Sequence, residues 1–236
     1  MRTAAFAVLF YGFTVLILVA TVLVMPFSHR ALLALPGTWS RWHRFCVRHV
    51  LGIEVLIEGE RPEGQAIYAM RHESYFEAID IPTFIGGAPI PFAKEELSRI
   101  PLWGIAADRY GLISVERTRG PDALRAMAKA ARALKPSGRS FAIFPEGTRV
   151  PQGETRPLGA GTYAIYKLLG LPLAAVAVRS RHVYAQKPKR SGTIRYRVVE
   201  VIEPGLDRDT FESRVFAAIN ALNPPRQDRI GDQPGS

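Results

Sequence analysis

Cysteine is nearly absent from this chain of 236 residues, in which Cys46 is the single example. One cysteine cannot form an internal disulfide, and it cannot supply a cysteine-rich zinc site. Such low cysteine use is typical of proteins that work in a reducing compartment. No catalytic context surrounds Cys46, so the sequence does not favour a nucleophilic thiol either.

Several familiar catalytic motifs are also missing. There is no Gly-x-Ser-x-Gly sequence, which argues against a serine hydrolase of the α/β-hydrolase type. There is no His-Glu-x-x-His sequence, because the fourth residue after His72 is Phe76, and there is no Walker glycine-rich loop. We therefore expect neither a metal nor a cofactor, and any nucleophile has to come from the substrate.

Acidic residues are too few to balance the basic ones. Lys and Arg number 31 against 21 Asp and Glu, which gives a formal net charge of +10. An excess of this size indicates an anionic partner. The candidates are nucleic acid, an acidic membrane surface and a phosphorylated substrate. No recognisable nucleic-acid-binding motif accompanies the charge. We therefore expect membrane lipid or a phosphorylated molecule as the partner, and no nucleic acid.

Charged residues are absent from residues 3–28, which are mostly apolar. This run is longer than the roughly 20 residues that a helix needs to cross a bilayer. A cleaved signal peptide is the alternative, but its apolar region is usually about 7–15 residues long. We therefore expect an uncleaved membrane helix. Because Arg2 alone precedes the run and Arg30, Arg41, Arg44 and Arg48 follow it, the positive-inside rule places the rest of the chain in the cytoplasm, at the inner membrane.

A basic amphipathic helix is expected after the membrane helix. Arg41, Arg44 and Arg48 fall on one face at helical spacing, with aromatic and apolar residues largely opposite. Such a helix suits the headgroup boundary of a membrane. An ordinary surface helix packed on the domain is the alternative. The sequence also leaves open whether the two helices form a hairpin that dips into one leaflet or whether the first one spans the membrane.

Short apolar runs alternate with helical patterns from residue 53 onward. The expected strands are residues 53–58, 65–70, 89–93, 111–115, 140–144, 171–178 and 193–202. One expected helix begins at Ser74. Three others cover about residues 121–135, 161–169 and 209–222. This alternation predicts an α/β fold with a mixed, largely parallel sheet flanked by helices. The last strand alternates between apolar residues and arginine, which predicts a position at the edge of the sheet.

A histidine and a carboxylate follow the second expected strand, in the sequence RHESYFE at residues 71–77. On one uniform helix His72 and Glu77 would lie about 140° apart. If the helix starts at Ser74, a capping box brings Glu77 back toward the Ser74 backbone and the imidazole. The carboxylate then fixes one ring nitrogen while the other accepts a proton from a hydroxyl. A capped helix beside an uninvolved histidine is the alternative.

Groups that suit phosphate binding follow two other expected strands. The first set is Phe-Pro-Glu-Gly-Thr-Arg at residues 144–149, where Gly147 lets backbone amides approach a ligand. The planar fork of Arg149 can grip a phosphate. Residues 111–117 repeat this arrangement and end on Arg117. For either arginine alone, a solvated surface position is the alternative.

In this order, the segments resemble the motifs of the glycerolipid acyltransferase family, above all of bacterial 1-acylglycerol-3-phosphate acyltransferases of the PlsC type. Residues 72–77 fall on the family's His-x4-Asp motif, and residues 111–117 look like its second motif. Residues 144–149 match the third motif, Phe-Pro-Glu-Gly-Thr-Arg, without a change. Residues 171–178 are similar to the fourth motif, although Ala175 stands where a proline is common. The resemblance runs from about residue 65 to residue 178.

The resemblance implies a role for each of these positions. His72 would be the general base on the acceptor hydroxyl, and Glu77 would orient it. Arg117 would bind the phosphate of the acceptor. The residues that would shape the acceptor site are Glu146, Gly147, Thr148 and Arg149. Glu77 departs from the family pattern, because it stands where aspartate is more common and so extends the carboxylate by one methylene.

The implied reaction moves a fatty acyl group from an acyl thioester to the sn-2 hydroxyl of lysophosphatidic acid, which gives phosphatidic acid. The thioester would be carried by acyl carrier protein or by coenzyme A. Another lysolipid acceptor, such as a lyso-ornithine lipid, is an alternative because of Glu77. A non-catalytic lipid-binding protein of the membrane surface is an alternative from another class.

We expect three parts in the chain. Residues 1–50 are the membrane helix and the basic amphipathic helix, and residues 51–222 are the acyltransferase domain. Residues 223–236 are polar and rich in Pro and Gly, which is typical of a disordered tail.

Overall fold

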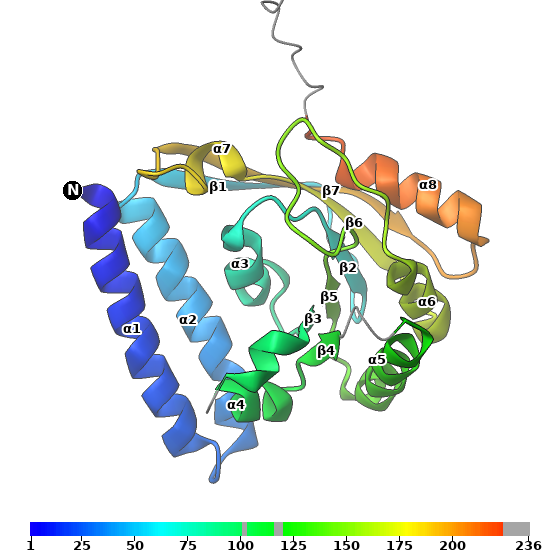
Figure 1. Cartoon of the computed structure of the whole chain (residues 1–236), viewed down its shortest axis with the longest axis horizontal. Helices are drawn as coiled ribbons and strands as arrows, with labels where there is room; N and C mark the ends of the chain where they lie inside the picture. Colours follow the sequence, from blue (N-terminus) through cyan, green and yellow to red (C-terminus); the bar gives the residue numbers. More distant parts are fainter. Residues whose placement is uncertain (101–102, 116–119, 224–236) are drawn as a thin grey trace, which may run out of the picture.

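The computed structural model describes residues 1–100, 103–115 and 120–223 of the chain (Figure 1). The expected phosphate-binding residue Arg117 lies outside the described residues. The expected disordered tail also lies outside them, except for Asn223.

Seven strands of the described chain form one sheet in the order β1-β7-β6-β2-β5-β3-β4. Neighbouring strands are parallel, except that β6 and β7 are antiparallel. The strands are β1 (Ile53–Glu58), β2 (Ile67–Met70), β3 (Ile90–Lys94), β4 (Ile113–Val115), β5 (Phe141–Ile143), β6 (Leu173–Arg179) and β7 (Gly192–Ile202). The predicted mixed, largely parallel sheet is therefore confirmed, and each expected strand is present.

Helices cover both faces of this sheet (Figure 1). The helices on one face are α5 (Gly120–Leu134), α6 (Ala160–Leu169) and α8 (Arg208–Ile219). Those on the other face are α2 (His29–His49) and α3 (Tyr75–Ile85), with α1 (Arg2–Val24) outside them. Shorter helices connect these parts: η1 (Glu95–Arg99), α4 (Trp103–Tyr110), η2 (Lys135–Ser137) and α7 (Arg181–Tyr184). The sequence did not lead us to expect η1, α4 or α7.

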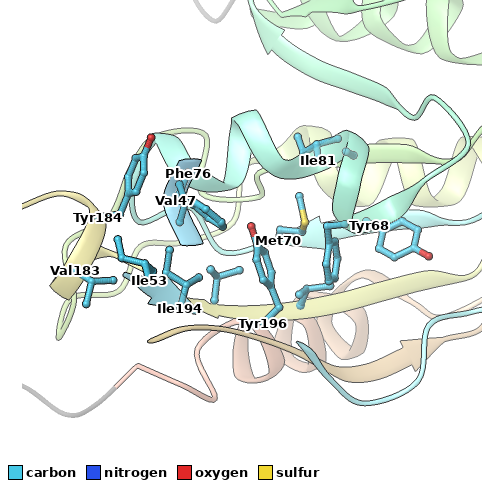
Figure 2. Packing of buried hydrophobic residues seen from close by; sticks show 14 of the residues in the cluster. Val47, Ile53, Tyr68, Met70, Phe76, Ile81, Val183, Tyr184, Ile194 and Tyr196 are labelled. Carbon is cyan, nitrogen blue, oxygen red and sulfur yellow. The ribbon is translucent and has the colours of Figure 1, made fainter. Parts of the chain in front are cut away.

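The two hydrophobic cores follow from the two-residue period of the strands. In β2, Ile67 and Ala69 join the core under α5, α6 and α8, whereas Tyr68 and Met70 join the core under α3. Figure 2 shows part of the second core, in which Phe76 of α3 lies above strand residues such as Ile194. Because both faces are covered, the central strands are apolar throughout, as expected for buried parallel strands.

The expected edge position of β7 is wrong. β7 lies between β6 and β1, and β1 is the edge strand on that side of the sheet. Ile194 and Tyr196 are buried under the helices, while Arg195 points to solvent on the other face. Alternation of apolar and polar residues indicates that one face of a strand is exposed to solvent. An interior strand with one exposed face therefore shows the same pattern as an edge strand.

The two N-terminal helices pack side by side along the α/β domain (Figure 1). Among the described residues, α1 is the one helix that is long and apolar enough to cross a membrane, by length and composition. Phe6 and Phe10 of α1 are buried against His43 of α2, whose Nε2 lies 2.8 Å from the hydroxyl of Tyr184. Burial lowers the pKa of His43 to about 3, so the His43 ring is neutral at pH 7.

Arg44 does not belong to the basic outer face that the sequence predicted for α2. Its guanidinium turns toward the domain and binds the Asp80 carboxylate through two hydrogen bonds of 2.6 and 2.7 Å. The Asp80 side chain is fully buried, whereas Arg41 and Arg48 are exposed. A buried carboxylate needs a charged partner. That requirement draws Arg44 inward and fixes α2 on α3.

We predict that Arg44→Met destabilises the protein by about 3 kcal/mol at pH 8, because it leaves the buried Asp80 charge without its partner. Burial raises the pKa of Asp80 from 3.8 to about 6, although Arg44 opposes the shift. A carboxyl group whose pKa is raised by folding stabilises the folded protein at a pH below the pKa that the group has in the unfolded chain. This stabilisation is lost as the pH rises through about 6, the pKa in the folded protein. The penalty of Arg44→Met should therefore shrink toward pH 5, where Asp80 is mostly neutral.

Chemical denaturation of the parent and of Arg44→Met at pH 5 and pH 8 measures this difference. Arg48→Met is the matched control, since Arg48 is exposed on the same helix and should cost little at either pH. A penalty that is independent of pH would contradict the assigned role of the Asp80 charge.

Candidate active site

His72 lies in the turn between β2 and α3, at the carboxyl edge of the sheet. Ser74 is the N-cap of α3, and both halves of the predicted capping box are present. The Ser74 hydroxyl accepts a hydrogen bond from the Phe76 amide at 3.1 Å, and Glu77 Oε2 accepts one from the Ser74 amide at 2.9 Å. The capping box is confirmed, and it turns the Glu77 carboxylate back toward the histidine.

His72 and Glu77 are in contact. The imidazole Nδ1 lies 3.3 Å from Glu77 Oε2, and the ring stacks on Phe144 with centroids 4.0 Å apart. Since a carboxylate accepts hydrogen bonds, Nδ1 carries the proton and Nε2 keeps its lone pair. No residue of the described chain is hydrogen-bonded to Nε2, and 15% of the His72 side chain is exposed. The geometry therefore offers a basic nitrogen to a ligand.

The second predicted segment, residues 144–149, surrounds the same histidine. The His72 amide donates to Glu146 Oε2 at 2.8 Å, and the His72 carbonyl accepts from the Val150 amide at 2.7 Å. β5 lies next to β2 and runs parallel to it, so the carboxyl ends of the two strands meet. The two segments that the sequence singled out thus form one site.

Gly147, Thr148 and Arg149 form the outer part of the site. Gly147 has φ = +67°, which a residue with a side chain rarely adopts, and its amide donates to the Phe144 carbonyl at 2.9 Å. Thr148 is half-buried and Arg149 is exposed. The guanidinium of Arg149 lies 4.0 Å from the centre of the Tyr75 ring, which holds it at the rim of the site.

Arg71 is the group that the sequence analysis missed. It is fully buried, and its five N–H groups all have acceptors. The acceptors are Glu73 Oε1 (3.2 Å), Glu146 Oε1 (3.2 Å), Asn220 Oδ1, and the carbonyl oxygens of Pro151 (3.1 Å) and Glu154 (2.8 Å). The sequence did carry a signal for this pair, because Arg71 and Glu73 flank His72 directly after an apolar strand. Charged residues in such a position are buried only in pairs.

The carboxylates around Arg71 are strongly affected by burial. Desolvation raises the pKa of Glu146 to about 7, against the opposing effects of the His72 amide and Arg71. Burial also raises the pKa of Glu73, whose Oε2 accepts hydrogen bonds from the amides of Ser180 (2.9 Å) and Arg181 (3.1 Å). Perturbed carboxyl groups of this kind gather at functional sites.

Ser180 is a second residue that the sequence analysis missed. It is fully buried at the end of β6, and its hydroxyl contacts both Glu77 Oε1 and the hydroxyl of Ser74.

Among the described residues, no group of three His, Cys, Asp or Glu side chains is arranged to hold a metal ion.

Comparison with known sequences shows the family of the chain. Residues 49–179, more than half of the chain, match the sequence model of the Acyltransferase family. The chain belongs to the acyltransferase family. The resemblance on which the sequence analysis relied is therefore confirmed, and so is the prediction that the protein is an acyltransferase. Most residues of the candidate site lie within the matched part of this acyltransferase. Ser180 and Asn220, which accepts a hydrogen bond from Arg71, lie outside it.

This acyltransferase is similar to proteins from bacteria and animals. A 1-acyl-sn-glycerol-3-phosphate acyltransferase of Pseudomonas aeruginosa is 28% identical over 204 residues, which cover 84% of this chain and 76% of the relative. A 1-acyl-sn-glycerol-3-phosphate acyltransferase alpha of Homo sapiens is 26% identical over 159 residues, which cover 65% of this chain and 56% of the relative. The chain thus spans little more than half of the human protein.

A solved structure shares the fold. The 1-acyl-sn-glycerophosphate (LPA) acyltransferase PlsC from Thermotoga maritima superposes with a TM-score of 0.63 at 21% sequence identity. The match covers 93% of this chain and 90% of the other, so it includes the N-terminal helices as well as the sheet.

We predict that Arg71→Met destabilises this acyltransferase by about 3–5 kcal/mol, because it leaves Glu73 and Glu146 buried without a cation. Chemical denaturation at pH 8 measures the loss. Arg125→Met is the matched control, since Arg125 forms an exposed ion pair with Asp122 on α5 and should change stability by less than about 0.5 kcal/mol. Equal losses in the two variants would disprove the central position of Arg71.

Proposed function

We propose that the protein transfers a fatty acyl group from an acyl thioester to the sn-2 hydroxyl of lysophosphatidic acid and so forms phosphatidic acid. The observation that carries this proposal is the contact of His72 Nδ1 with Glu77 at 3.3 Å, which leaves Nε2 as a base. The bacterial and human relatives, which are 1-acyl-sn-glycerol-3-phosphate acyltransferases, support this acceptor. The donor is a thioester of acyl carrier protein or of coenzyme A.

In the proposed reaction, His72 Nε2 takes the proton of the acceptor hydroxyl while Glu77 stabilises the imidazolium that forms. The acceptor oxygen attacks the thioester carbonyl and forms a tetrahedral intermediate. Collapse of this intermediate breaks the C–S bond, and the imidazolium returns its proton to the departing thiolate. The product ester and the free thiol leave His72 in its starting state. Each proton is accounted for by His72 and the two substrates.

Acceptor recognition in this proposal lies at the rim of the site. Arg149 is exposed and held by Tyr75, so its guanidinium can bind a phosphate beside His72. We assign the same task to Arg117. Thr148 and the turn at Gly147 complete the wall of the acceptor site, and Glu146 holds that wall to the His72 amide.

The test is an acceptor panel assayed with both thioester carriers. We expect transfer to lysophosphatidic acid, and little transfer to a monoacylglycerol with the same chain or to a lyso-ornithine lipid, because both lack the phosphate. His72→Ala should lower kcat by about 10²–10⁴-fold, the usual contribution of a general base. Sedimentation with lipid vesicles should show that His72→Ala binds membranes as well as the parent does.

His49→Ala is the matched control, because His49 is exposed at the end of α2 and should leave kcat unchanged. Transfer by His72→Ala at the parental rate would show that His72 is not the base. Transfer to the monoacylglycerol at a similar rate would argue against phosphate recognition. If the parent acylates none of the acceptors, the non-catalytic lipid-binding alternative is favoured.

For the membrane attachment, we propose that α1 and α2 lie in the cytoplasmic leaflet of the inner membrane as a hairpin. α1 exposes large apolar side chains such as Val8 and Leu16, and Phe27 in the following turn is 88% exposed. Near its start, Thr3 accepts a hydrogen bond from the Lys189 amide, and just past its end Met25 accepts one from Arg109. A spanning helix places its ends on opposite sides of the bilayer, whereas both ends of α1 contact one domain.

Cysteine labelling distinguishes the hairpin from a spanning helix. In a Cys46→Ala background, we expect Ala4→Cys to react with an impermeant maleimide in inside-out vesicles and not in intact spheroplasts. Ser137→Cys, on the exposed η2 turn, is the control for the cytoplasmic side. Labelling of Ala4→Cys from the outside would show that α1 spans the membrane.

A further inference from the structure

Ser180 lies beside the candidate dyad without a role in the proposed reaction. It directly follows β6, its side chain is fully buried, and its amide donates to Glu73 Oε2 at 2.9 Å. β6 is parallel to β2, so the end of β6 reaches the same edge of the sheet as His72. The backbone of Ser180 is thus fixed by one buried carboxylate, and its hydroxyl is aimed at another.

The direction of each hydrogen bond around Ser180 follows from counting protons. The Ser180 hydroxyl donates to Glu77 Oε1, because an ionised carboxylate only accepts hydrogen bonds. The Ser180 oxygen then accepts the proton of the Ser74 hydroxyl, which lies 2.8 Å away. The Ser74 oxygen in turn accepts from the Phe76 amide. The result is a directed chain of donors that ends on the carboxylate.

The two oxygens of Glu77 therefore have separate tasks. Oε2 faces His72 Nδ1 and the Ser74 amide, whereas Oε1 is held by the Ser180 hydroxyl. The Ser74 hydroxyl is a longer contact of both oxygens, at 3.3 Å from Oε1 and 3.4 Å from Oε2. Holding both oxygens fixes the rotation of the carboxylate about its last bond, and so fixes the line between Oε2 and the imidazole. A glutamate has one more rotatable bond to fix than an aspartate.

We propose that Ser180 is a positioning residue that holds the Glu77 carboxylate in line with His72, and that this role depends on the length of the glutamate side chain. An aspartate would withdraw the carboxylate by about 1.5 Å, one C–C bond, and so take it away from Ser180. Residues 77 and 180 are then energetically coupled. This inference rests on the proposed function of His72 and Glu77.

The test is a double-mutant cycle of Ser180→Ala and Glu77→Asp, with kcat, both KM values and thermal stability measured for each protein. Ser180→Ala alone should lower kcat about 10- to 100-fold, which is the fold-change of one lost hydrogen bond to a charged group. The two KM values should change by less than about twofold. In the Glu77→Asp background, Ser180→Ala should lower kcat by less than about twofold.

The matched control is Ser40→Ala. Ser40 is also fully buried and hydrogen-bonded, to Thr83 at 2.6 Å, but it lies on α2 away from the site. It should lower stability about as much as Ser180→Ala and leave kcat unchanged. If Ser180→Ala does not fold, Ser180→Cys replaces it, because the thiol keeps the volume and is a weak donor. Its loss of kcat should be several-fold.

Two results would overturn the inference. One is a kcat of Ser180→Ala equal to that of the parent, and the other is the same fold-loss in the glutamate and aspartate backgrounds. Failure of the proposed function has a different signature, in which the parent transfers no acyl group or His72→Ala remains active. An active parent, an inactive His72→Ala and an unaffected Ser180→Ala would reject this inference alone.

Discussion

The burial of Arg71 is the constraint on which the rest of the site depends. A guanidinium without solvent must satisfy five donors, and here the acceptors come from chain segments far apart in the sequence. Glu73 follows β2, Glu146 follows β5, and Asn220 ends α8. Because none of these groups can move without stranding a buried charge, Arg71 ties the loops at this edge into one unit. His72 lies inside that unit.

The same network explains the charge distribution around His72. Glu73 and Glu146 pair with the buried Arg71 guanidinium, and Glu77 contacts His72. Desolvation raises the pKa of Glu146 to about 7. The cation of Arg149 lies outside, at the exposed rim of the site. In the proposed function, this division of charge between interior and rim separates the task of proton transfer from that of phosphate binding.

Helix α3 links the site to the N-terminal helices. Its first turn carries Glu77, which contacts His72, and one turn later Asp80 binds Arg44 of α2. The helix that orients the candidate base is therefore the one on which the apolar hairpin is docked. The aromatic contacts of His43 with Phe6 and Tyr184 complete the docking. This arrangement holds the site at a fixed position relative to the apolar surface of α1.

Local pattern by itself determined the strands, the main helices, the capping box at Ser74 and the two segments that carry the site. These features depend on residues within a few positions of one another, which is the range over which periodicity and capping act. The tertiary structure alone decided that β7 is an interior strand, that Arg44 turns inward to Asp80, and that Arg71 and Ser180 join the site. Arg71 and Asn220 are 149 residues apart. No local pattern encodes such a contact, because it forms only when the folded chain brings a distant acceptor to a buried charge.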